Sequence, residues 1–169
     1  MIEINETNFP DANFRQYLLS LNYGTKGILT DMSIKKTAKI DVRWRNISSL
    51  KGIEYFTSLK ELNCYENKLK DLDVSKNTEL ISLNCGYNEI TTLDISKNVK
   101  LQQLECNCNE LVALDVSNNT ELIELSCGGC LGIKNLDLSN NAKLTELCCD
   151  YSWLTDLKLP NNTELADFI

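Results

Sequence analysis

The sequence contains no histidine in its 169 residues and only two prolines. Without histidine, the chain cannot form the Ser-His or Cys-His dyads that activate many catalytic nucleophiles. Acidic residues outnumber basic ones by 24 to 17, and the resulting net charge of −7 provides no basic face for nucleic acid or an anionic membrane. The sequence also lacks a glycine-rich phosphate loop and an apolar run of about 20 residues. These absences disfavour an enzyme, a nucleic-acid-binding protein and a membrane-inserted protein, and they indicate no cofactor. The first residues, Met1 to Glu6, do not have the pattern of a signal peptide.

A repeat of 21 or 22 residues occupies most of the chain. Its first leucine recurs at Leu59, Leu80, Leu101, Leu122, Leu144 and Leu165. One such unit cannot bury its own apolar side chains, so each coil must cover the next for a continuous core to form. The repeat therefore predicts a long, thin solenoid of about six stacked coils.

Each unit begins with a pattern that is typical of a β-strand. Leu62 and Cys64 alternate with Glu61, Asn63 and Tyr65, which predicts an inward and an outward row of side chains. The equivalent strands are expected to be parallel and to begin near residues 39, 61, 82, 103, 124 and 146. The asparagines after the strands, at Asn67, Asn88 and Asn109, suit corners because their side chains can bind nearby backbone. The second half of the unit favours a turn, a short second strand and another turn.

Two features of the sequence resemble a known family. The run Leu-Asp-Val/Ile/Leu-Ser-x-Asn, at 72–77, 93–98, 114–119 and 136–141, resembles a bacterial subclass of leucine-rich repeat. The segments 8–15 and 50–56 resemble the front part of secreted or surface leucine-rich-repeat proteins of anaerobic gut bacteria. The resemblance implies a mostly β solenoid with a small N-terminal α-helical cap. It further implies a monomeric protein-binding module, located extracellularly or on the bacterial cell surface.

The N-terminal part differs from the repeats. Apolar residues at Phe14, Tyr17, Leu18 and Leu21 predict an amphipathic helix of about three turns. We assign residues 1–36 to a helical cap and 37–169 to the solenoid, in a single folded unit. The segment from Asn22 to Ser33 is similar to an EF-hand loop, but it lacks the required acidic ligands, and we expect it not to bind calcium.

The eight cysteines fall into two groups. Five recur at the inward strand position, where a thiol acts as a small hydrophobic side chain: Cys64, Cys85, Cys106, Cys127 and Cys149. We expect these thiols to be buried and reduced. Cys108 and Cys148 are expected to face outward, and Cys130 occupies a corner that is asparagine in other coils. These three thiols are expected to react with a thiol reagent in the native state. A Cys108–Cys130 disulfide is one alternative for this pair. No metal-ligand spacing is present.

Aspartates also recur once per coil, at Asp73, Asp94, Asp115 and Asp137. A residue that every coil contains is best explained by coil geometry, as part of a turn or of a hydrogen-bond ladder between coils. We therefore predict no catalytic residues.

The outward strand positions vary from coil to coil, and related solenoids bind partners on this face. The face carries seven acidic residues and two basic ones, Lys39 and Arg43, both at its N-terminal edge. Its candidate partner-binding residues are Arg43, Trp44, Glu61, Tyr65, Tyr87, Glu105, Glu124 and Tyr151, and the four aromatic residues among them are expected to be exposed. We predict a protein partner with a basic contact patch, except at the N-terminal edge, which is expected to prefer an acidic feature. The alternative function is a structural spacer or adhesin stalk without its own ligand.

Overall fold

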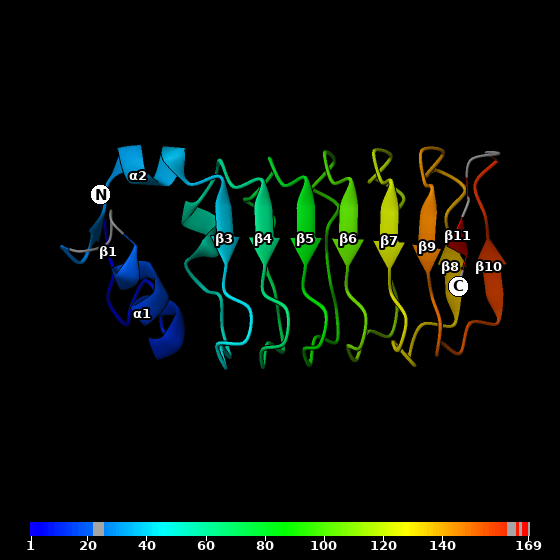
Figure 1. The fold of residues 1–169 in the computed structure, drawn as a ribbon, viewed down its shortest axis with the longest axis horizontal. Coiled ribbons are helices and arrows are strands. Elements are labelled where there is room, and N and C mark those ends of the chain that lie inside the picture. The colour runs from blue at the N-terminus through cyan, green and yellow to red at the C-terminus, as the bar shows by residue number, and fades with distance from the viewer. Residues whose placement is uncertain (22–25, 162–164, 166, 169) are drawn as a thin grey trace.

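The computed structural model describes residues 1–21, 26–161, 165 and 167–168. Its main feature is a parallel sheet of seven strands in the order β11-β9-β7-β6-β5-β4-β3, which forms one side of a β-solenoid (Figure 1). The strands are β3 (Lys39–Asp41), β4 (Glu61–Asn63), β5 (Ser82–Asn84), β6 (Gln103–Glu105), β7 (Glu124–Ser126), β9 (Glu146–Cys148) and β11 (Asp167–Phe168). The first six begin where the repeat predicts them to begin. The predicted solenoid of about six coils with parallel strands is therefore confirmed.

The register of the sheet keeps equivalent residues of successive coils side by side. Leu62 of β4 pairs with Ile40 of β3 and with Leu83 of β5, and the same relation continues to β9. Because strand side chains alternate between faces, this register builds continuous inward columns of leucine and cysteine. Cys64, Cys85, Cys106, Cys127 and Cys149 are all buried in the core, as predicted.

The return half of the coils contains fewer strands than predicted. Within the described residues, paired strands occur there only as β8 (Asn135–Asp137) and β10 (Asp156–Lys158), which form a parallel two-stranded sheet. In Figure 1 these two strands lie near the C-terminal end of the solenoid. The prediction of a second strand in every coil is wrong, because most return segments bury alternate side chains without forming ladder hydrogen bonds. The return of the first coil contains a short 3₁₀ helix, η1 (Ile53–Tyr55).

Two columns of asparagine hold neighbouring coils together. At the corner after the strand, the Nδ2 atom of Asn88 donates to the carbonyls of Cys64 in the preceding coil and of Cys85 in its own, at 3.0 and 3.1 Å. At the end of the return, Asn98 donates to the carbonyls of Val74 and Asn77 in the preceding coil, at 3.1 and 2.9 Å. These side chains satisfy buried carbonyl groups that the turns would otherwise leave unpaired.

The N-terminal end of the solenoid is covered by a small cap. It contains β1 (Ile2–Glu3), paired antiparallel with β2 (Ile28–Leu29), and the helices α1 (Ala12–Ser20) and α2 (Asp31–Lys36). Helix α1 is nine residues long, and Asp11 caps it by accepting from the backbone N–H groups of Asn13 and Phe14. Leu21 follows the helix instead of belonging to it, so α1 is shorter than the predicted three turns. Phe14, Tyr17 and Leu18 are buried against the first coil, as a cap requires.

Residues 22–25 of the loop that is similar to an EF-hand lie outside the described residues. The expectation that this loop does not bind calcium therefore stays a prediction. Helix α2 begins after Thr30, whose side chain accepts from Ser33 in a capping box. No helix of the described residues is long and apolar enough to span a membrane.

Candidate functional site

The outward side of the main sheet continues into a lip, where the chain leaves each strand. At one position of this lip, every coil has a left-handed backbone with φ between 50° and 71°. We call these residues the left-handed column: Trp44, Glu66, Tyr87, Cys108, Gly129 and Tyr151. Only the fifth is glycine, although a side chain in this conformation costs roughly 1–2 kcal/mol. Positions at which a chain accepts such a backbone cost are candidates for a functional role.

The left-handed column places large aromatic side chains in solvent. Trp44 is 63% exposed, Tyr87 47% and Tyr151 85%. Tyr65 lies one residue before the column in the second coil and is half-buried, so the prediction that all four aromatics are exposed is wrong for this residue. The reason is that Tyr65 lies between two neighbouring rings.

Trp44, Tyr65 and Tyr87 form a continuous aromatic ledge across the first three coils. The rings of Trp44 and Tyr65 meet edge to face with centroids 6.3 Å apart, and those of Tyr65 and Tyr87 are 5.2 Å apart. The indole Nε1 of Trp44 donates to Glu66 at 2.9 Å, and Arg43 lies over the indole ring at 5.2 Å from its centroid. The rings are thus held in a defined arrangement, although they belong to segments 21 or 22 residues apart.

The two bases of the strand face are both paired internally. Lys39 contacts Glu61 at 2.6 Å, and Arg43 contacts Asp41 at 2.8 Å. The N-terminal edge therefore has no excess of positive charge, and the prediction that it prefers an acidic feature loses its basis. Among the described residues, five acids of the face have no ion pair: Glu66, Glu105, Glu124, Glu146 and Asp150.

Three of these acids line a shallow hollow of about 470 Å³ over β6, β7 and β9. We call it the acidic hollow, and it is lined by Glu105, Glu124 and Glu146 together with Ser126 and Cys148. Partial burial, and then the negative charge of Glu124, raise the pKa of Glu105 above its ordinary value. Asn84 and Gln103 donate to Glu105 and Glu124 at 2.8 and 3.0 Å. The carboxylates are consequently oriented, but their charges are not neutralised.

The lip next to the acidic hollow has small side chains. Gly128 and Gly129 occupy the fifth coil, and a Cβ atom at Gly128 would lie 2.2 Å from the Asp150 carboxylate and 2.7 Å from its carbonyl oxygen. The sixth coil then presents Tyr151. Seven of the eight predicted partner-binding residues thus form two groups, the aromatic ledge with its charged neighbours and the acidic hollow. The eighth, Tyr151, lies apart from both, in the sixth coil.

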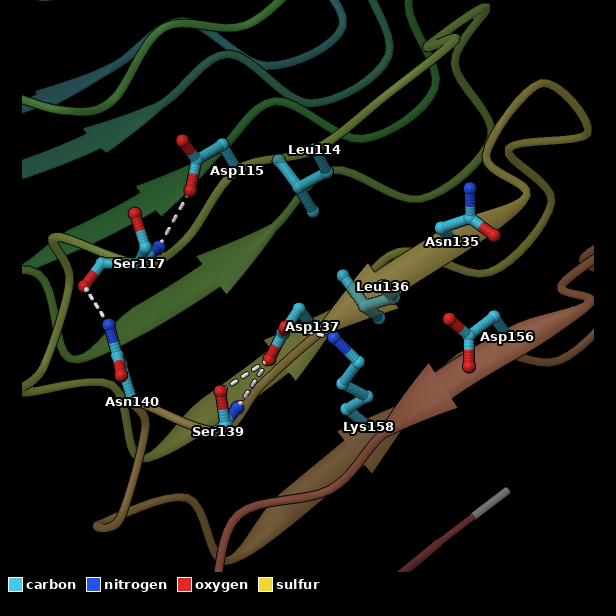
Figure 2. Close-up of a pocket in the computed structure, with 10 residues that line it drawn as sticks. All are labelled: Leu114, Asp115, Ser117, Asn135, Leu136, Asp137, Ser139, Asn140, Asp156 and Lys158. Carbon is cyan, nitrogen blue, oxygen red and sulfur yellow. Dashed lines mark hydrogen bonds and ion pairs between the residues drawn. The ribbon is translucent and has the colours of Figure 1, made fainter.

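The return side of the solenoid has a second hollow, of about 380 Å³, where the repeated aspartates lie (Figure 2). Asp115 and Asp137 accept from the backbone N–H groups of Ser117 and Ser139, at 2.9 and 3.0 Å, so the repeated aspartates belong to turns within each coil. Asp137 also contacts Lys158 of the next coil at 2.9 Å. The Ser139 side chain and Lys158 lower the pKa of Asp137 to about 2. A carboxylate that is ionised and occupied in this way is poorly suited to proton transfer.

The cysteines show no arrangement that indicates chemistry. All eight are free thiols, and burial raises the pKa of both Cys85 and Cys127 to about 12. Cys130 is fully buried, and its thiol donates to the Cys106 carbonyl at 3.3 Å, in place of the corner asparagine. Among the described residues, no three His, Cys, Asp or Glu side chains are placed to hold a metal ion.

Comparison with known proteins supports the fold more than the function. No protein-family model and no curated protein matches the chain. Among solved structures, the functional domain of InlJ from Listeria monocytogenes, which includes a cysteine ladder, is 26% identical with a TM-score of 0.71. That alignment covers 98% of this chain and 46% of the other. The internalin InlF from the same organism is 26% identical with a TM-score of 0.80, over 88% of this chain and 46% of the other.

The leucine-rich-repeat domain of APL1B has a TM-score of 0.71 at 18% identity, over 92% of this chain and 48% of that one, which shows a common fold alone. The chain thus spans about half the length of these proteins. Its structural neighbours are leucine-rich-repeat proteins, and it has their β-solenoid fold.

Proposed function

We propose that this chain is a protein-interaction module that binds its partner through the strand face and the lip, as part of an exported or cell-surface bacterial protein. Its solved neighbours include internalins, and proteins with leucine-rich repeats generally bind other proteins. The proposed contact residues are Arg43, Trp44, Glu61, Tyr65, Tyr87, Glu105, Glu124 and Tyr151.

The observation that carries the proposal is the retention of exposed aromatic side chains in the left-handed column. Tyr151 is 85% exposed at φ 50°, and in the neighbouring coil Gly129 fills the equivalent position. A fold selected only for stability gains little from an exposed tyrosine where glycine would relieve the backbone. Exposed tyrosine and tryptophan are, however, the residues that contribute most often to binding hot spots.

The test uses Tyr151→Gly and Trp44→Gly on an immobilised chain that is exposed to bacterial and host lysates. We expect these variants to retain less of a bound protein, while the free energy of unfolding of Tyr151→Gly stays equal or rises by up to about 1 kcal/mol. The matched controls are Val99→Ala and Val112→Ala, which remove exposed apolar side chains outside the strand face. Retention that is lost with the valine variants and kept with the glycine variants would place binding elsewhere. Retention unchanged in all four variants would also place binding elsewhere, and no protein retained by the unmodified chain would favour a structural spacer.

A further inference from the structure

The chain covers several of its own aromatic rings with cations. Arg43 lies over Trp44, Arg45 lies over Tyr17 at 5.0 Å, and Lys134 lies over Trp153 at 4.4 Å from the ring centroid. Among the described residues, no cation lies over Tyr65 or Tyr87. The exposed Tyr87 ring, at the C-terminal end of the aromatic ledge, therefore offers an open face to a cation from another molecule.

The charges around this ring favour the same kind of ligand. Glu66 lies on the lip one coil before Tyr87, and Glu105 begins the acidic hollow one coil after it. Neighbouring strands lie about 4.8 Å apart and a strand rises about 3.3 Å per residue. Glu124, two coils further on and five residues nearer the start of its strand, therefore lies roughly 15–20 Å from Tyr87, a distance that three residues of extended chain cover together with the length of two arginine side chains. The nearest bases of the face, Lys39 and Arg43, are paired with acids and do not offset these charges.

We propose that the partner presents an extended, arginine-bearing segment to this surface, with one guanidinium on Tyr87 and a second held between Glu105 and Glu124. The inference rests on the proposed function, because it specifies the partner of the same face. Arginine fits better than lysine for two reasons. Its planar guanidinium stacks on aromatic rings, and its fork of N–H donors can bind carboxylates in pairs. A cation between Glu105 and Glu124 would also relieve the repulsion between these two carboxylates.

The experiment uses three synthetic peptides with blocked ends: Gly-Arg-Gly-Gly-Arg-Gly, the same peptide with lysine, and the same peptide with citrulline, which is neutral and close to arginine in shape. Binding to the full chain is followed by NMR or calorimetric titration. We expect the arginine peptide to bind several-fold more tightly than the lysine peptide. The citrulline peptide is expected to show no saturable binding, because it lacks the charge.

Variants separate the two contacts from a general attraction of cations to an acidic protein. Tyr87→Ala is expected to weaken the arginine peptide by roughly 3- to 30-fold and to reduce its advantage over lysine. The double variant Glu105→Gln and Glu124→Gln is expected to weaken both peptides. Its matched control is Asp73→Asn with Asp94→Asn, which gives the same net charge of −5 by altering the return side. This control is expected to leave binding nearly unchanged.

Three results would overturn the inference: equal affinity for arginine and lysine that Tyr87→Ala does not alter, equal weakening by the two double variants, or no binding of any peptide. Each of these leaves the proposed function in place as long as Tyr151→Gly and Trp44→Gly still reduce protein retention. The proposed function fails on that retention assay, independently of the peptides.

Discussion

Replacing Asn109 with alanine measures how strongly the corner asparagines connect neighbouring coils. The Nδ2 atom of Asn109 donates to the carbonyls of Cys85 and Cys106 at 2.9 and 3.0 Å. Its Oδ1 atom accepts from the backbone N–H of Ile90 at 3.0 Å. Asn109 is buried, so alanine would leave the Ile90 N–H without a partner and would leave the carbonyls of Cys85 and Cys106 with only their second donors, Asn88 and Cys130.

The magnitude follows from these three groups. A buried N–H without a partner costs about 1–3 kcal/mol, and the loss of one of a carbonyl's two hydrogen bonds costs about 0.5–1 kcal/mol, so the lower half of the first range gives a total of about 2–4 kcal/mol for Asn109→Ala. Cysteine should be a better replacement, because Cys130 already occupies the equivalent corner of the next coil and donates to the Cys106 carbonyl. We therefore expect Asn109→Cys to cost about 1–3 kcal/mol, since one donor is kept.

The assay is equilibrium unfolding in urea, followed by circular dichroism and by tryptophan fluorescence. The control is Asn118→Ala at an exposed position, for which we expect a change within about 0.5 kcal/mol. The dependence of unfolding free energy on urea should be similar for all variants, so that midpoints can be compared. A loss below about 1 kcal/mol for Asn109→Ala, or a cysteine variant that is less stable than the alanine variant, would refute the reasoning.

Three further predictions concern reactivity, acid stability and the cap. Under native conditions a thiol reagent is expected to modify only Cys108 and Cys148, which are partly exposed. The other six cysteines are buried and should react only after unfolding, which mass spectrometry of the labelled chain checks. Because folding lowers the pKa of Asp137 to about 2, its contribution to stability is present above the unfolded value of about 3.8 and is lost as the pH falls through about 2. Asp137→Asn should therefore flatten the loss of stability between about pH 4 and pH 2 in acid titrations, and an unchanged profile would contradict this assignment. Gly52→Ala is expected to lower the melting temperature by several degrees, because residue 52 has φ 105° and the added Cβ would lie 2.1 Å from the Phe9 ring. An unchanged melting temperature would show that the cap adjusts freely.

The burial of Cys130 corrects one prediction made from the sequence. Its place outside the inward row suggested an accessible thiol, similar to Cys108 and Cys148. The corner position is instead fully buried, because it lies where the asparagines of other coils enter the core to bind backbone carbonyls. The equivalence of Cys130 to Asn109 was visible in the repeat, but the depth of the corner was not.

The sequence by itself determined the solenoid, the starts of its strands and the inward rows of leucine and cysteine. These features depend on a period of two within each strand and a period of 21 or 22 residues between coils, and both are written in the order of the residues. The sequence also identified the eight candidate contact residues, because they occupy positions that the repeat leaves free.

Only the tertiary structure decided how these side chains combine. The contact of Trp44 with Tyr65, the pairing of Lys39 with Glu61 and the acidic hollow all join residues that lie one coil or more apart. Their distances depend on coil stacking and on side-chain rotamers, which no local pattern specifies. The left-handed column was also hidden, because tryptophan and tyrosine rarely adopt positive φ, and their presence there becomes visible only when the backbone of each turn is known.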